Sequence, residues 1–187
     1  MKQRLLNYLL PTTGLFIIIS CFWVISGVRT TQLVYLFLGL FIGIFLLDID
    51  HFIFWFLIKP NTEESRLIKL AIENKKFKSV IKIVQTSHQT HYNLIFHHYF
   101  FQVIFTLFSL FILTSTQNAF ISALILSLNL HLVIDEIIGY KSNPKIVQKW
   151  LFAREPKQLP IVFLKRYIAI FITFIILFTF LLIQAKI

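Results

Sequence analysis

Apolar residues run through this chain in segments that are too long for the elements of a soluble domain. Five of these segments are long enough to cross a bilayer as helices, which takes roughly 20 residues. The pattern predicts spans near Leu10–Val28, Leu33–Ile58, Leu94–Leu113, Ala119–Tyr140 and Tyr167–Gln184. The predicted fold class is therefore all-α: a polytopic membrane helix bundle of about five transmembrane helices, in one domain over residues 1–187.

The segments between the spans carry a second pattern. Residues 63–85 alternate apolar residues and lysines at helical spacing, and the segment around Trp150 does the same. This spacing is typical of amphipathic helices that lie on a membrane surface. We interpret both segments as interfacial helices that anchor to membrane lipids, with a role in substrate recognition as the alternative.

Composition agrees with a membrane protein. The chain is 57% hydrophobic and contains 22 Phe, which excludes an ordinary soluble domain. Its net charge of +10 does not indicate nucleic acid as a partner, because lysine and arginine follow the second and fourth loops rather than a recognition motif. The positive-inside rule then predicts a cytoplasmic N-terminus. We expect the N-terminal segment to be a retained first span, with a cleaved signal peptide as the alternative.

Ionisable residues gather inside the predicted spans, although each costs about 2.5–3.5 kcal/mol to insert at the centre of a bilayer. Three separate spans place them at one depth, roughly 5–15 Å from the cytoplasmic surface at 1.5 Å per residue. Packing alone does not explain this arrangement. The residues are Asp48, Asp50, His51, His98, His131 and Asp135, with His97 and Glu136 adjoining them.

The spacing of these residues decides which of them share a helix face. His131 and Asp135 are four residues apart, and Asp48 and His51 are three apart, so each pair lies on one face. Asp50 lies about 200° from Asp48 on a straight helix. Either the helix loosens at this point, or Asp50 acts from outside the group of ligands.

Aspartate and histidine together are typical ligands of a divalent metal ion. We expect zinc first, with manganese or magnesium as alternatives. The candidate ligands are Asp48, Asp50, His51, His98, His131 and Asp135, with His97 and His91 as additional candidates. His88 and His91 lie in a loop, where solvated histidines are common, and Glu136 is expected near the interface, facing Lys141 or Lys145.

At these residues the chain resembles the YdjM-like, LexA-regulated, membrane-bound metal-dependent hydrolases of the bacterial inner membrane. The resemblance rests on Asp48-Ile49-Asp50-His51, on His98 after the next span begins, and on His131-x-x-x-Asp135, and it covers roughly Gly39–Tyr140. The family usually reads His-Arg-Gly-x-Thr-His-Ser in the middle block. This chain instead reads Asn93-Leu94-Ile95-Phe96-His97-His98-Tyr99.

The resemblance implies an inner-membrane, metal-dependent hydrolase. A divalent ion held by Asp48, His98, His131 and Asp135 would activate water, and Asp50 or His51 would complete the shell, orient a histidine or accept the proton. A site near basic interfacial helices favours an amphiphile with an anionic head group, such as a lipid-like phosphoester.

Two other classes of function remain open. A structural or adaptor membrane protein would use a metal, or a cluster of His and Asp, only to hold its spans together. A proton or cation transporter would continue the polar residues across the membrane. The outer halves of the spans carry only uncharged polar residues, such as Gln102, Ser109, Ser122 and Ser127, which favours a one-sided pocket.

Overall fold

The computed structural model describes residues 2–87, 94–153 and 160–185, without the side chains of residues 2–4, 81 and 84–87. The regular elements in these ranges are all helices, which confirms the all-α prediction. In chain order they are α1 (Lys2–Ile25), α2 (Thr30–Leu46), α3 (Ile49–Ile53), the π-helix η1 (Phe54–Ile58), α4 (Glu63–Glu73), α5 (Phe77–Ser87), α6 (Tyr99–Ser115), α7 (Ala119–Ser142), α8 (Pro144–Leu151) and α9 (Ile161–Gln184).

Within the described residues, four stretches are long and apolar enough to cross a membrane: Leu5–Ile25, Thr30–Ile58, Ala119–Ser142 and Ile161–Gln184. They correspond to the first, second, fourth and fifth predicted spans. The third predicted span is the shorter helix α6, which has 17 residues. At 1.5 Å per residue it measures about 25 Å, less than the roughly 30 Å of a hydrocarbon core. It is short because residues 94–98 form a turn instead of the first turns of the helix.

The faces of α6 nevertheless suit lipid. Leu107 and Phe111 are exposed, whereas Gln102, Thr106 and Ser109 are buried. The polar side chains bond to neighbouring groups inside the bundle: the amide of Asn129 on α7 donates to Ser109 Oγ at 2.7 Å, and Ser109 donates to the carbonyl of Phe105 at 2.6 Å. Polar side chains that bond between helices while apolar ones face outward are typical of membrane interiors. We therefore place α6 in the membrane layer with the four longer stretches.

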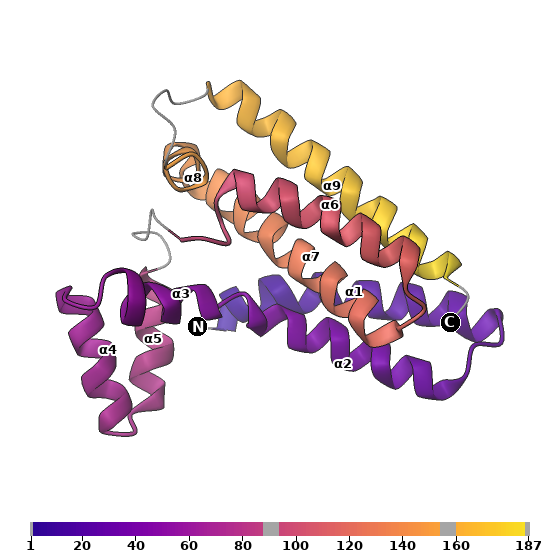
Figure 1. Ribbon diagram of the computed structural model, residues 1–187, viewed down its shortest axis with the longest axis horizontal. Helices are drawn as coiled ribbons and strands as arrows, with labels where there is room; N and C mark the ends of the chain where they lie inside the picture. Colours follow the sequence, from indigo (N-terminus) through magenta and orange to yellow (C-terminus); the bar gives the residue numbers. More distant parts are fainter. Residues whose placement is uncertain (1, 88–93, 154–159, 186–187) are drawn as a thin grey trace.

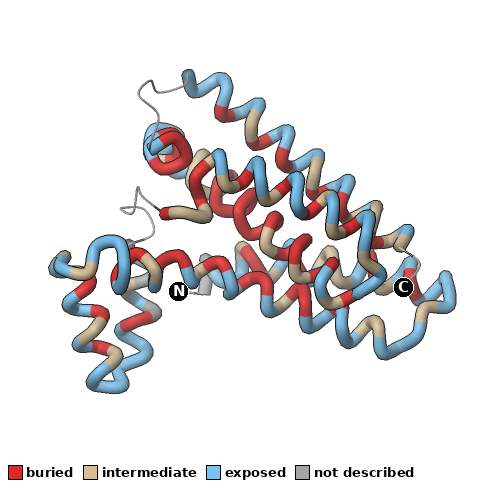
Figure 2. Tube along the Cα trace, in the orientation of Figure 1, coloured by how far each residue is buried: buried red, intermediate tan, exposed pale blue. Residues whose placement is uncertain are grey.

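The central helix of the bundle is α7. In the most apolar part of α7, 72% of the residues are buried, compared with 22–33% in the other three long stretches. Figure 1 shows α7 with α1 and α2 on one side and α6 and α9 on the other, and Figure 2 shows buried positions concentrated along it.

Small residues allow α2 and α7 to pack closely. Gly39 and Gly43 of α2 face Ala123 and Ser127 of α7, and a Cβ atom on Gly43 would lie only 2.6 Å from the Cβ of Ser127. Ser127 also donates a hydrogen bond to the carbonyl of Leu40 at 2.5 Å. Two glycines four residues apart, facing small residues, are a common contact between membrane helices. This contact fixes the end of α2 against the middle of α7.

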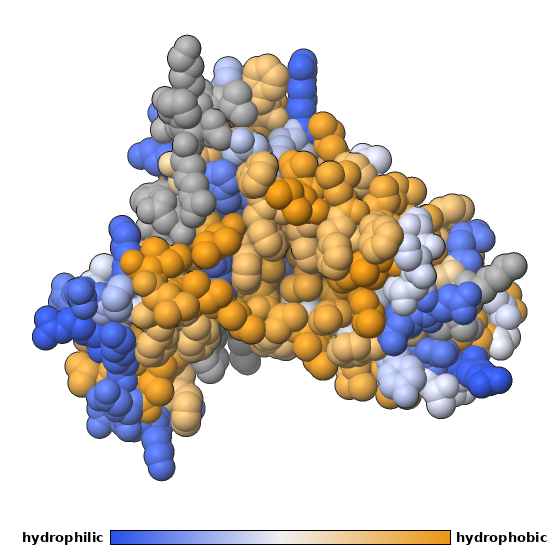
Figure 3. Space-filling model, viewed as in Figure 1, coloured by the Kyte–Doolittle hydropathy of each residue, from blue (hydrophilic) through white to orange (hydrophobic). Residues whose placement is uncertain are grey.

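One end of the bundle carries α4, α5 and α8, and we call it the hairpin end. Helices α4 and α5 lie side by side and project from the bundle (Figure 1), and they pack through Ile68 and Val80 on Phe54 and Trp55 of η1. Hydrophilic side chains gather over α4 and α5 and at the opposite end of the molecule, with apolar ones between (Figure 3). The helices predicted within residues 63–85 are thus present as a pair.

Candidate metal centre

The helix of the second span loosens where the acidic motif begins. After Leu46, the backbone N–H of Asp48 donates to the carbonyl of Phe45 at 3.2 Å, three residues back, instead of continuing the α-helical pattern to Ile44. The carbonyl of Ile44 is therefore released from its helical partner. This is one of the two arrangements that the spacing of Asp48 and Asp50 allowed.

His131 uses the released carbonyl. Its Nδ1 lies 2.6 Å from the carbonyl oxygen of Ile44, and because a carbonyl can only accept, Nδ1 carries the proton. In the neutral ring, Nε2 then presents a lone pair. That atom lies 3.3 Å from Oδ2 of Asp135, one helical turn further along α7. The break in α2 thus sets the tautomer of a histidine on another helix.

Asp50 organises the turn before α6. It is fully buried and accepts the backbone N–H groups of Ile95 (3.2 Å, on Oδ1) and Phe96 (2.8 Å, on Oδ2). The same Oδ2 lies 3.3 Å from Nδ1 of His97. Asp50 therefore holds both the turn and the ring that follows it, and directs Nε2 of His97 away from itself.

Asp135 is the point where the two histidines meet. Its Oδ2 lies 3.2 Å from Nε2 of His97 and 3.3 Å from Nε2 of His131. Its other oxygen, Oδ1, accepts a hydrogen bond from the hydroxyl of Tyr8 on α1, whose ring also packs on His131 with centroids 4.6 Å apart. Trp150 of α8 packs edge-on against His97 at 5.7 Å. All five side chains are at most 8% exposed.

Three of these side chains form a group that could hold a metal ion. The ligand atoms of His97, His131 and Asp135 all lie within 4.8 Å of one another. Two ligands bound at about 2.0–2.1 Å to a tetrahedral ion lie about 3.3–3.4 Å apart, close to the two distances that end on Asp135. The other ring nitrogen of each histidine lies within hydrogen-bonding distance of a carboxylate or a carbonyl oxygen, as in almost all metal-binding histidines. The buried His/His/Asp group could therefore hold a metal ion.

The other predicted ligands are not among these three side chains. Asp48 is half-buried in the turn after α2, and His51 is fully buried on α3, with its ring centroid 6.4 Å from that of His97. His98 precedes α6 as its N-terminal cap, where Nδ1 accepts the backbone N–H of Phe100 at 3.3 Å. The group that could hold a metal includes His97 and not His98. His91 and His88 lie outside the described residues.

Two residues of the site region were not recognised from the sequence. Tyr8 lies on α1, two residues before the predicted start of the first span at Leu10, and no local signal marks it. Glu136 was expected to face Lys141 or Lys145 near the interface, which is wrong: its side chain is fully buried, and neither carboxylate oxygen forms a hydrogen bond to a described residue. Its position directly after Asp135 in the His131 motif was the one available signal.

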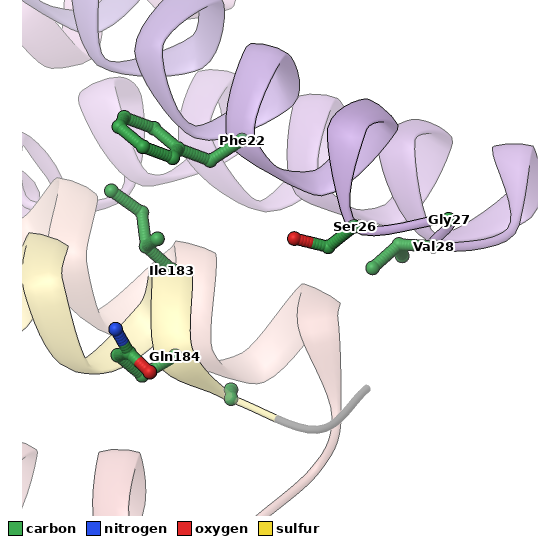
Figure 4. Close-up of a pocket in the computed structure, with 7 residues that line it drawn as sticks. Phe22, Ser26, Gly27, Val28, Ile183 and Gln184 are labelled. Carbon is green, nitrogen blue, oxygen red and sulfur yellow. The ribbon is translucent and has the colours of Figure 1, made fainter.

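A separate pocket of about 400 Å³ opens at the far end of α1. Figure 4 shows Phe22 of α1 and Ser26, which follows the end of α1, on the side of the pocket opposite Ile183 and Gln184 near the end of α9. It is lined by Phe22, Ser26, Gly27, Val28, Ile183, Gln184 and Ala185, which include no acid or histidine. The pocket therefore offers none of the ligand types of the candidate metal centre.

Comparison with known proteins adds no relative. No protein-family model matches the chain, and no curated protein or solved structure matches it significantly.

Proposed function

We propose that this chain is a membrane-embedded, metal-dependent hydrolase whose metal is held by His97, His131 and Asp135. The observation that carries the proposal is the convergence of two histidine Nε2 atoms on Oδ2 of Asp135, at 3.2 and 3.3 Å, with each histidine oriented by a second partner. Three protein ligands leave one position of a tetrahedral zinc ion for water, which is the usual arrangement in catalytic zinc sites. The resemblance to the YdjM-like hydrolases supports the same class.

A bound divalent ion supplies an activated water and polarises a phosphoryl or acyl oxygen. The neighbouring side chains then have distinct tasks. Asp50 orients His97 through Nδ1, and Tyr8 occupies Oδ1 of Asp135, so that Oδ2 faces the two histidines. His51, buried beside His97, is the candidate to accept the proton of the water.

The surroundings of the centre suggest the class of substrate. Trp150 belongs to the amphipathic helix α8, and Asp50 lies one turn before the π-helix on which α4 and α5 pack, so the centre lies toward the hairpin end. Each of the three helices at this end carries two basic residues: Arg66 and Lys69 in α4, Lys78 and Lys82 in α5, and Lys145 and Lys149 in α8. We propose that the hairpin end faces the cytoplasm of a bacterial cell and that the substrate is an inner-leaflet amphiphile with an anionic head group, such as a lipid phosphoester.

The deciding experiment is elemental analysis of the detergent-purified protein beside a His131→Ala/Asp135→Ala variant. We expect about one equivalent of zinc or manganese in the wild-type protein and its loss in the double variant. Release of phosphate or head group from lipid phosphoesters is then measured for both proteins. If the wild-type protein holds no metal even after reloading, the hydrolase proposal is wrong.

A second candidate function follows from one observation in the same group. His97 lies within hydrogen-bonding distance of both Asp50 and Asp135, so a protonated His97 would offset their charge without a metal. In that case the cluster would only hold helices together, as in a structural or adaptor membrane protein. Absence of metal in the wild-type protein, together with loss of stability in His97→Ala, would support this second candidate.

A further inference from the structure

The hairpin of α4 and α5 buries one apolar face of each helix within the protein. Ile68 and Ala71 of α4 and Val80 of α5 are buried in a hydrophobic cluster of their own, packed on Phe54 and Trp55 of η1. An apolar face that packs on protein is not available to lie on lipid. Any contact of this hairpin with the membrane must therefore use a different surface from the face that packs on η1.

A second set of apolar side chains on the hairpin stays exposed. Leu67 and Leu70 are three residues apart, on one side of α4, and they are 51% and 54% exposed. Phe77, the first residue of α5, is 62% exposed. These three side chains lie outside the four long apolar stretches, so the need to cross a bilayer does not explain their exposure.

Positive charge surrounds the exposed phenylalanine. Lys75, Lys76 and Lys78 flank Phe77 in the chain, and all three lysines are exposed. Over residues 59–82, seven basic residues stand against three acidic ones. The turn between α4 and α5, which we call the hairpin tip, thus combines an exposed aromatic ring with a net positive charge.

The hairpin also lies where a membrane surface is expected. Helix α4 begins five residues after the membrane-spanning stretch Thr30–Ile58 ends. Helices α4 and α5 run across the direction of α1 and α2 (Figure 1), so they follow the surface of a membrane that those helices cross. With 11 residues, α4 is about 16 Å long at 1.5 Å per residue. The hairpin tip is therefore carried sideways from the bundle, at the level where a span ends.

An aromatic ring among lysines suits the head-group layer of an anionic membrane, where the ring enters the interface and each lysine is attracted to acidic lipid. A protein partner would have to cover the same lysines, although lysine is depleted from the buried centres of protein interfaces. We propose that the hairpin tip docks on an anionic leaflet through Leu70 and Phe77, with Lys75, Lys76 and Lys78 against the lipid head groups. This docking goes beyond the proposed function, because it involves neither the metal nor its ligands.

The test uses the full chain with Cys21→Ala, so that a nitroxide label can be attached at Leu70→Cys alone. The protein is placed in nanodiscs of neutral phosphatidylcholine, and in nanodiscs in which anionic phosphatidylglycerol replaces part of that lipid. Power-saturation electron paramagnetic resonance then measures collisions of the label with a water-soluble nickel complex. We expect at least about twofold fewer collisions in the anionic nanodiscs, because the docked tip withdraws the label from water.

Two triple variants test whether the charge at the tip is responsible. Lys75→Gln/Lys76→Gln/Lys78→Gln should abolish the difference between the two nanodiscs. The matched control neutralises three exposed lysines of α7 and α8 at the same end of the bundle and should keep the difference; it is Lys141→Gln/Lys145→Gln/Lys149→Gln.

Three results would overturn the docking. They are equal collisions in both nanodiscs before any lysine is changed, a difference that persists in the tip variant, and a difference that both triple variants lose alike. A strongly immobilised label in detergent would show that a protein segment or a second copy covers the tip, and would overturn lipid as the partner. None of these measurements needs a bound metal, so failure of the metal centre leaves their result unaffected.

Discussion

Replacing Asp50 by asparagine should weaken zinc binding although Asp50 is not one of the three ligands. Its carboxylate accepts the N–H groups of Ile95 and Phe96 and contacts Nδ1 of His97 at 3.2, 2.8 and 3.3 Å. Asparagine has nearly the same shape, but its amide nitrogen donates and cannot accept. At least one of the three groups therefore loses its acceptor, and the negative charge behind His97 disappears.

The size of the effect follows from that lost contact. A hydrogen bond to a charged group contributes about 1.5–3 kcal/mol, and about 1.4 kcal/mol corresponds to a tenfold change in an equilibrium constant. We therefore expect the dissociation constant for zinc to rise about 10- to 100-fold, the range found for residues that orient metal ligands. Part of the lost energy would appear as lower stability of the protein, because Asp50 also holds the turn before α6.

Competition with a chromophoric zinc chelator measures the dissociation constant in detergent, and thermal unfolding of the same samples measures stability. Glu73→Gln removes an exposed carboxylate elsewhere and should change neither quantity. If Asp50→Asn binds zinc within about twofold of the wild type, the orienting role is refuted, whatever happens to its melting temperature.

Four further outcomes are expected. His97→Ala should lose metal, whereas His98→Ala should keep it and destabilise the start of α6 by about 1 kcal/mol; elemental analysis and thermal unfolding separate the two effects. Gly43→Leu should destabilise the bundle by about 1–3 kcal/mol, because the new side chain would overlap α7. Gly14→Leu is the control and should not destabilise it, because no atom lies within 4 Å of the added Cβ. Unfolding in detergent compares the two variants. A reporter fused at Lys82 should stay cytoplasmic, and a periplasmic signal would invert the proposed orientation. Metal affinity should fall as pH falls, because protons compete for the histidine nitrogens; zinc titrations at two pH values test this.

Much of the fold was predictable because lipid imposes a strong constraint on sequence. Long apolar runs must become helices when no water is present to satisfy the backbone, so the helical class followed directly from hydropathy. The amphipathic segment between the second and third spans was also predictable from its helical spacing. The third span was predicted too long, because the apolar residues Leu94–Phe96 continue the hydropathy signal into a turn that Asp50 holds through its side chain.

The candidate site was only partly predictable. The convergence of His131 and Asp135 follows from their i, i+4 spacing, and Asp50 could be placed at the same depth. The sequence could not show which of His97 and His98 joins the group. The choice depends on a non-helical turn that is held by Asp50, which lies 47 positions before His97 in the chain. Tyr8 had no local signal at all, since its contact with Asp135 spans 127 residues of sequence.

The contact between α1 and α7 has a consequence for how the protein is made. A ribosome delivers Tyr8 and Asp50 to the membrane well before Asp135, the residue that joins Tyr8 to both histidines. During that interval Asp50 lies in an apolar environment, and Asp135 is still missing from the polar cluster. Assembly of the polar cluster must therefore be a late event in biogenesis, and a chain truncated before α7 should be recognised by membrane quality control as incomplete.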